Sequence, residues 1–96
     1  MPAGYIIAIV DVTDLDKYKA YAAEAGPATL KCGGRYLARG GPFEVLEGGF
    51  PGKRFVVLEF ESVEKAKAFY HSPEYQAARK HRLDGANFNM VVVEGA

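Results

Sequence analysis

The chain has 96 residues, with twelve lysines and arginines against twelve aspartates and glutamates, and therefore a formal net charge of zero. This balance argues against a general affinity for nucleic acid or for an anionic membrane, because both need a net positive field. A chain of this length is expected to form a single domain over residues 1–96. It buries only a modest share of its surface, so burial against a second copy would add to its stability.

Cysteine content and the N-terminal segment bear on the cellular compartment. The single cysteine, Cys32, excludes an internal disulfide. The first apolar run, residues 5–10, is too short to cross a membrane and has no basic residues before it, unlike a signal peptide. We therefore expect a cytoplasmic protein.

The first half of the chain predicts a strand, a helix and a second strand. Residues 4–12 are apolar and β-branched, which indicates a strand buried on both faces. A helix follows, with Thr13 as its cap and Asp16 completing a capping box. Gly26 and Pro27 predict a kink, or a restart with Pro27 at the first position of a short second piece. Residues 35–39 predict the second strand, which the sequence Gly-Gly-Pro then breaks as a bulge or turn.

The second half predicts a strand, two helical pieces and a last strand. Residues 43–47 are expected to continue extended, residues 48–53 to form a turn-rich loop, and residues 54–61 to form the third strand. Ser62 caps the next helix, and Ser72 with Pro73 starts a further short helix that runs to about residue 82. Residues 86–94 predict the fourth strand.

The element order βαββαβ indicates an α+β fold of the ferredoxin-like kind. It has a four-stranded antiparallel sheet with both helices on one face. The first, third and fourth strands nevertheless carry apolar side chains on both faces. An apolar sheet face of this size is not left in water, so we expect a homodimer in which the two sheets face each other.

Several stretches together resemble a known family. They are GYIIAIVDVTD at the start, GGRYLARGG from residue 33, VLEG from residue 45, VVLEFES from residue 56 and AFYHSPEYQAARKHR from residue 68. On these stretches the chain resembles the DUF1330 family, within the dimeric α+β barrel superfamily. The resemblance implies the fold and the dimer, but no catalytic residues, because the activity of the family is not established.

The resemblance also suggests a small-molecule site by analogy of fold. Relatives in the superfamily include cofactorless monooxygenases, muconolactone-isomerase-like enzymes and haem-degrading proteins. We expect no metal and no cofactor, because His71 and His81 are ten residues apart and lack the spacing of helical ligands. The glycine pairs lack the strand–GxGxxG–helix context of a dinucleotide site.

Charged side chains on otherwise apolar strands are the first candidate site, namely Asp11, Arg39 and Glu59. A buried charge needs a partner, and Arg39 with Glu59 is a complementary pair between the second and third strands. One interpretation is a structural ion pair. The other is the polar end of a pocket, in which Arg39 orients a substrate oxyanion and Glu59 acts as a base.

The helix break is the second candidate site. His71 could shuttle a proton, and Tyr5 and Tyr75 could hydrogen-bond a ligand oxygen. The alternative is that Ser72 only caps a helix while the tyrosines pack against the sheet.

These residues predict a pocket between the helices and the sheet or inside the barrel mouth. Its polar groups are Arg39, Glu59 and His71, and its lining residues are Tyr5, Ile7, Phe55, Val57, Phe69 and Tyr75. Such a pocket suits a small, partly apolar molecule with one acidic or carbonyl group. An enzyme of the cofactorless oxygenase or isomerase type would use it, and the alternative is a non-catalytic ligand-binding or dimerisation module.

Overall fold

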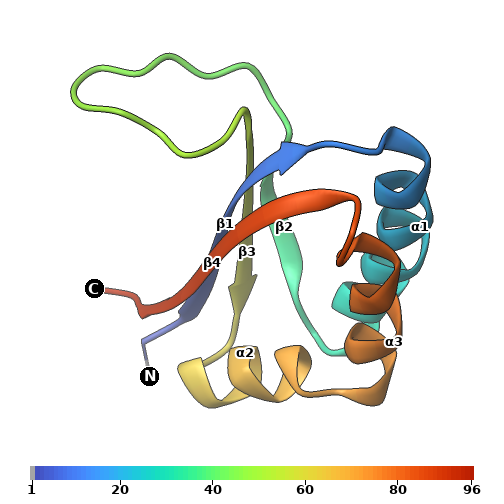
Figure 1. Cartoon of the computed structure of the whole chain (residues 1–96). Coiled ribbons are helices and arrows are strands. Elements are labelled where there is room, and N and C mark those ends of the chain that lie inside the picture. Colours follow the sequence, from blue (N-terminus) through green and yellow to red (C-terminus); the bar gives the residue numbers. More distant parts are fainter. Residues whose placement is uncertain (1) are drawn as a thin grey trace.

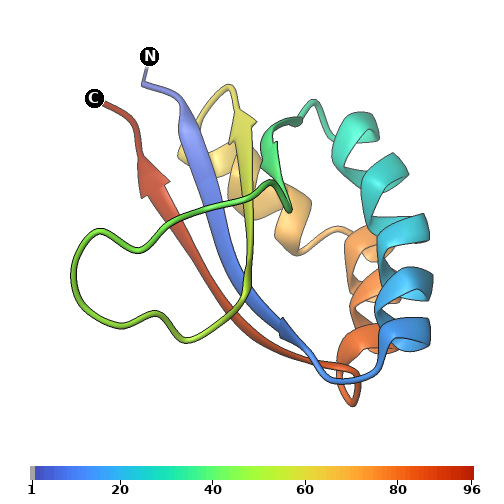
Figure 2. The same cartoon turned by 90° about the horizontal axis from the view of Figure 1, so that it is seen from above.

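Four antiparallel strands in the order β2-β3-β1-β4 form one sheet, and three helices lie on one side of it (Figures 1 and 2). The computed structural model describes residues 2–96. Its elements are β1 (Gly4–Val12), α1 (Leu15–Lys31), β2 (Arg35–Arg39), β3 (Arg54–Phe60), α2 (Val63–Tyr70), α3 (Pro73–Arg82) and β4 (Ala86–Glu94). The α+β, ferredoxin-like fold predicted from the element order is confirmed.

The core lies between the sheet and the helices. The sheet contributes buried side chains that point to the helical side, namely Ile6, Ala8 and Val10 of β1 and Leu58 and Phe60 of β3. The helices supply the rest of the buried apolar residues, namely Tyr18, Tyr21, Ala25, Ala28, Ala66, Phe69, Tyr75 and Ala78. Alternate residues of each strand point to the opposite side, which we call the open face because no helix covers it.

The first helix starts later than its predicted cap would allow. Asp14 is the N-cap, and its Oδ1 accepts a hydrogen bond from the backbone N–H of Lys17 at 3.2 Å. The backbone N–H groups of Thr13 and Asp14 both donate to the Gly85 carbonyl at 2.9 Å, which holds this segment outside the helix. The predicted capping box of Thr13 with Asp16 is therefore wrong.

Pro27 does not restart a helix, because α1 runs without interruption from Leu15 to Lys31. A proline inside a helix leaves the carbonyl four residues earlier without its usual donor. Here that carbonyl belongs to Ala23, and both residues are exposed, so water can satisfy it. The helix therefore continues through Pro27, and the predicted restart is wrong.

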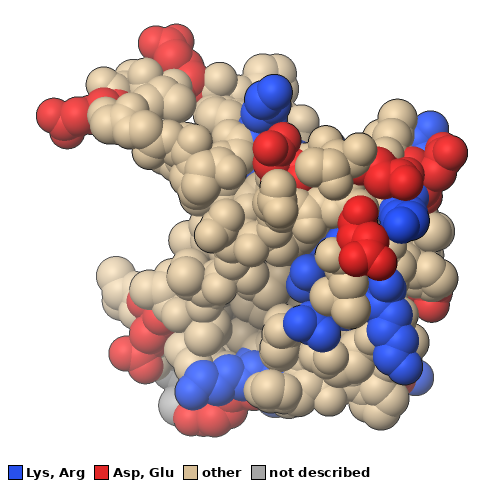
Figure 3. All heavy atoms as spheres, in the orientation of Figure 1, with Lys and Arg blue, Asp and Glu red and all other residues tan. Residues whose placement is uncertain are grey.

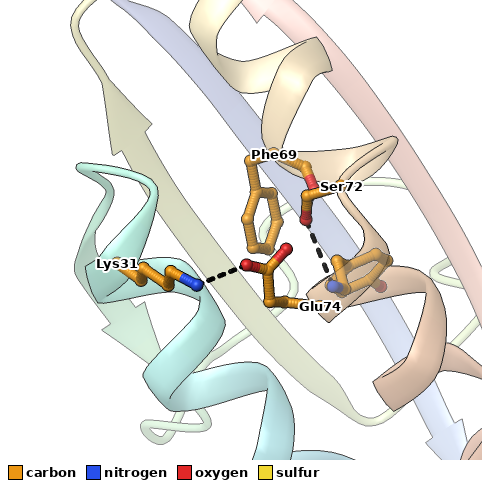
Figure 4. A network of polar contacts seen from close by, with 5 residues as sticks. Lys31, Phe69, Ser72 and Glu74 are labelled. Atoms are coloured by element: carbon orange, nitrogen blue, oxygen red, sulfur yellow. Dashed lines mark hydrogen bonds and ion pairs between the residues drawn. The ribbon is translucent and has the colours of Figure 1, made fainter.

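The break between α2 and α3 follows the prediction. The Ser72 hydroxyl donates to the Phe69 carbonyl at 2.7 Å and accepts from the backbone N–H of Tyr75 at 3.2 Å. Ser72 therefore closes α2 and caps α3. Close by, Lys31 at the end of α1 forms a 2.6 Å ion pair with Glu74 in the first turn of α3 (Figure 4).

A bulge in β2 changes which side chains of this strand face the helices. Arg35 pairs with Glu59 and Tyr36 with Leu58, but Ala38 then pairs with Val57, so Leu37 is the extra residue. One extra residue reverses the facing of every later side chain in the strand. The sequence placed a bulge or turn only after residue 39.

The segment from residue 40 to residue 53, which we call the arm, stands out from the sheet on the side away from the helices (Figures 1 and 2). Its ends are held by hydrogen bonds from Gly40 N–H to the Phe55 carbonyl at 2.8 Å and from Lys53 N–H to the Val10 carbonyl at 2.9 Å. Residues 43–47 join no sheet, so the predicted extension of the second strand is wrong. The third strand ends at Phe60, one residue earlier than predicted.

We predict that Gly34→Ala destabilises the fold through the core. A Cβ at Gly34 would lie 2.6 Å from Cζ of the buried Phe60 and 3.0 Å from Cγ2 of Thr29. Because overpacking of a core costs about 1–3 kcal/mol, the free energy of unfolding should fall by about that amount in urea denaturation.

Gly41→Ala is the matched control for this substitution. A Cβ at Gly41 has no heavy atom within 4 Å, and its backbone does not have a positive φ. Its free energy of unfolding should stay the same or rise slightly. Similar losses in both variants would contradict the close contact between Gly34 and Phe60.

Candidate functional site

A groove of about 590 Å³ lies between α2, α3 and the outer part of the sheet. It forms because α3 packs mainly against α1, whereas α2 packs on β1 and β4. The apolar floor comes from strands and helix alike, with Ile6, Ala66, Phe88 and Met90 among its residues. The polar side chains on its walls include Lys67, His71, Arg79 and Arg82.

Arg82 is the most deeply placed of these polar side chains, with 7% of its surface exposed. One Nη donates to the Tyr75 hydroxyl at 3.2 Å, and its guanidinium carbon lies 3.8 Å from the centroid of the Phe88 ring. Its Nε is buried and has no hydrogen-bond partner among residues 2–96. Within the same residues, no carboxylate forms an ion pair with Arg82.

The other basic groups sit closer to the mouth of the groove. Arg79, one turn before Arg82, is half-buried, and its Nε is also buried without a partner in the described chain. Lys67 and His71 are exposed, and the His71 ring meets the Tyr70 ring edge-on with 5.2 Å between centroids. No aspartate or glutamate lines the groove in the described part of the chain.

A smaller cavity of about 70 Å³ lies deeper, between the helices and the sheet, and shares Ile6, Phe88 and Met90 with the groove. A buried hydrogen bond in its wall joins the hydroxyls of Tyr21 and Tyr75 at 3.0 Å. Burial, and to a lesser degree the Tyr75 hydroxyl, raises the pKa of Tyr21 far above its usual range. Tyr21 therefore stays neutral and acts only as a hydrogen-bonding group.

A third polar cluster lies on the open face. Glu59 accepts hydrogen bonds from Arg35 Nε at 2.6 Å and from the Tyr5 hydroxyl at 3.1 Å. These two bonds, that of Arg35 foremost, lower the pKa of Glu59, and the bond to Glu59 raises the pKa of Tyr5. A lowered pKa makes Glu59 a weaker general base than an ordinary carboxylate.

The structure divides the predicted site residues among these three places. Arg39, Phe69 and Tyr75 line the inner cavity, His71 lies at the groove, and Tyr5 and Glu59 lie on the open face. The predicted set of lining residues cannot form one pocket, because Tyr5, Ile7, Phe55 and Val57 lie on the opposite side of the sheet from Phe69 and Tyr75.

The expected ion pair between Arg39 and Glu59 is not formed. The bulge at Leu37 turns Arg39 to the helical side, where its guanidinium carbon lies 4.2 Å from the centroid of the Tyr36 ring. Glu59 points to the open face and pairs with Arg35 instead. Asp11, the remaining charged residue of the predicted strand site, is half-buried near the end of β1.

Arg79 and Arg82 are not among the site residues predicted from the sequence. A signal was present in the helical spacing: Tyr75, Ala78 and Arg82 follow one another at intervals of three and four and are all buried. Tyr21 was missed as well. It is buried on α1, with 8% of its surface exposed.

Residues 2–96 contain no cluster of three or more His, Cys, Asp or Glu side chains that could hold a metal ion. Among these residues, no helix has the length and hydrophobicity needed to span a bilayer. The Nε2 of His81 contacts the Glu24 carboxylate on α1, away from the groove.

The family assignment follows from comparison of the sequence with family models. The model of DUF1330, described as a domain of unknown function, matches residues 3–96. The chain belongs to the DUF1330 family. No curated protein sequence matches it.

Solved structures show the same fold at low sequence identity. A protein of unknown function from Rhodopseudomonas palustris is 18% identical with a TM-score of 0.79, over 99% of this chain and 83% of that one. A dimeric ferredoxin-like protein of unknown function from Thermobifida fusca is 18% identical with a TM-score of 0.65, over 97% and 91%. A Nitrosomonas europaea protein, named only provisionally as an antibiotic biosynthesis monooxygenase, is 17% identical with a TM-score of 0.55, over 99% and 92%. At these identities the likeness shows the fold alone.

We predict that Arg35→Ala raises the pKa of Glu59, because it removes the hydrogen bond that lowers this pKa most. A carboxylate with a lowered folded pKa stabilises the fold above its unfolded pKa, and this contribution is lost as pH falls through the folded pKa. The stability difference between wild type and Arg35→Ala should therefore be present at neutral pH and shrink in acid. NMR titration of the Glu59 carboxyl carbon, with urea denaturation at several pH values, measures both effects.

Lys31→Ala is the matched control for this titration. It removes the partner of Glu74, whose pKa the Lys31 hydrogen bond lowers, and it should leave the titration of Glu59 unchanged. An unchanged Glu59 titration in Arg35→Ala would mean that the ion pair does not persist in solution.

Proposed function

We propose that this DUF1330 chain is a homodimer whose subunits meet through their open faces. This face carries apolar side chains on three adjacent strands, including Ile7, Val57 and Val91, which lie opposite one another across the sheet. Val91 is 58% exposed and Val93 is 46% exposed. Contiguous apolar surface of this kind marks an association site, and a two-fold axis lets one face cover its own copy. The fold shared with the T. fusca protein, which is described as dimeric, supports the proposal.

The arm extends this apolar surface beyond the sheet. Phe43 and Phe50 pack edge-on against Phe55, with ring centroids 5.0 and 5.3 Å away, and Phe55 belongs to the open face. Leu46 is 90% exposed. The surface below the arm is hollowed and largely free of charge in Figure 3. In the proposed dimer, the arm reaches over the partner subunit. Leu46 of the arm is then buried against that subunit.

The function that we infer for the dimer is to bind a small, partly apolar molecule in the groove. The groove itself carries this proposal, since its volume of about 590 Å³ lies within the range of roughly 300–1,000 Å³ common for small-molecule sites. Its apolar floor with a few convergent polar groups is also typical of such sites. The groove opens on the helical side of the sheet, and of its lining residues only Val91 belongs to the open face, so the proposed dimer leaves most of it accessible.

A catalytic step on the bound molecule is the second candidate, favoured by the position of His71 at the groove. An isomerase or a cofactorless oxygenase needs a base beside its substrate, and an imidazole can accept a proton in neutral solution. Arg39 and Glu59 lie outside the groove, so this proposal does not use them. Mass spectrometry of a bound compound after incubation separates the candidates: a new product supports catalysis, and unchanged compound supports binding alone.

We predict that Ile7→Lys converts the dimer to a monomer. Ile7 lies in the centre of the open face, between Val57 and Val91, and is only half-buried in the single subunit. A lysine there can reach water in the monomer but would bring two charges into the dimer interface. Sedimentation velocity should therefore show a monomer at concentrations at which the wild type is dimeric.

Leu30→Lys serves as the control, because Leu30 is an equally apolar residue, 66% exposed, at the end of α1 and away from the open face. It should remain dimeric. A wild-type protein that sediments as a monomer across micromolar concentrations would refute the dimer.

We predict that Val92→Trp blocks the groove without disturbing the core. Val92 lines the groove and is 37% exposed, so an indole can occupy the groove from its rim. Compounds that raise the melting temperature of the wild type in a metabolite screen should bind this variant at least about tenfold more weakly, as expected for loss of most apolar contact.

Leu83→Trp is the control for the added indole. Leu83 is 52% exposed at the end of α3 and does not line the groove, so ligand binding should be unaffected. Equal affinity of Val92→Trp and the wild type for every ligand found would place the binding site elsewhere.

A further inference from the structure

Arg82 is the least satisfied charged group in the described core. Its guanidinium has five N–H donors, yet its one hydrogen bond within the described residues goes to the neutral hydroxyl of Tyr75. Contact with the Phe88 ring offsets part of the cost of burial, as a cation–π interaction does. A buried cation without an anionic partner remains unfavourable.

Other side chains around Arg82 in the groove are also basic and also lack carboxylate partners within residues 2–96. Arg79 also has a buried Nε without an acceptor in residues 2–96, and Lys67 and His71 lie on the same groove. Basic side chains gather over α3 in Figure 3, beside the end of the groove formed by that helix. Since the lining residues include no carboxylate, no side chain of residues 2–96 that lines the groove neutralises this charge.

Two lysine or arginine side chains elsewhere in residues 2–96 have carboxylate partners. Arg35 pairs with Glu59, and Lys31 pairs with Glu74. Arg39 and Arg54 have no carboxylate partner either, so what sets Arg79 and Arg82 apart among residues 2–96 is a buried Nε without any hydrogen-bond partner. An anion that enters the groove would supply the missing acceptor.

We propose that the ligand of the groove is an organic carboxylate. Its carboxylate binds the guanidinium groups of Arg82 and Arg79, and its apolar part lies on Phe88 and Met90. A planar guanidinium matches the two oxygens of a carboxylate, and a charge-assisted hydrogen bond is stronger than a neutral one. The proposal rests on the function inferred above, that the groove binds a small, partly apolar molecule, and it adds the class of that molecule.

The apolar floor distinguishes an organic acid from an inorganic anion. A phosphate ion could satisfy the guanidinium groups but would leave the half-buried Phe88 and Met90 in contact with water. A neutral molecule could cover the floor but would leave both arginines without an acceptor. A molecule with a carboxylate at one end and a ring or short chain at the other does both.

The test compares acids with their own amides on the purified wild-type protein. Phenylacetate, benzoate and hexanoate are titrated beside phenylacetamide, benzamide and hexanamide, with inorganic phosphate as a third arm, and binding is followed by NMR chemical shifts of the groove residues. We expect at least one acid to bind about tenfold or more tightly than its amide, as a hydrogen bond to a charged group implies.

Variants then assign the preference to its residues. Arg79→Gln and Arg82→Gln should each remove most of the difference between acid and amide, whereas Lys80→Gln should keep it. Lys80 makes the same change of charge on the same helix but is exposed and does not line the groove. Because Arg79 is only half-buried, its variant remains informative if Arg82→Gln does not fold, and melting curves of all three report folding.

Each remaining outcome counts against a stated part of the proposal. Equal binding of acids and amides would leave the small-molecule groove standing and overturn the carboxylate. Phosphate that binds as tightly as the best acid would reduce the site to a simple anion site and overturn the organic ligand. An acid preference that survives both arginine substitutions would overturn the assigned residues. No saturable binding by any acid or amide would overturn this proposal and the binding function together.

Discussion

Three helices can cover only one face of the sheet, and the rest of the structure depends on this constraint. The inward side chains of β1 and β3, such as Val10 and Phe60, are almost completely buried beneath the helices. Most outward side chains of the same strands are apolar too, but residues 2–96 form no further helix or strand to cover them. The open face exists because all three helices lie on the other side of the sheet. The groove exists because α3 packs on α1 and leaves part of the sheet beside α2 uncovered.

The position of α3 decides where the groove lies. This helix packs mainly on α1, and the Lys31–Glu74 ion pair and the hydroxyls of Tyr21 and Tyr75 join the two helices. Because α3 is held against α1, it does not close over β4, and the space beside α2 stays open. The same arrangement carries Arg82 into the interior at the end of α3, away from the carboxylates that pair with other basic residues. Packing between helices thus places a cation that has no carboxylate partner within residues 2–96 on the wall of a groove with an apolar floor.

The fold and the proposed site stand on different evidence. Solved structures that share less than one residue in five with this chain have the same architecture, so likeness of fold carries no information about what the groove binds. The DUF1330 family, to which the chain belongs, is described as a domain of unknown function. The chemistry of this chain must therefore be read from its own side chains, of which Arg79, Arg82 and His71 are the most informative.

The amino-acid sequence alone determined the fold class, the element order and most element bounds. The alternation of β1 and the caps at Ser62 and Ser72 are local signals, complete within a few residues. Only the tertiary structure decided that Arg39 and Glu59 lie on opposite faces, because the bulge at Leu37 depends on how β2 pairs with β3. The groove likewise unites α2, α3 and β4, which are separated along the chain, so its unpaired arginines become evident only when those elements pack together.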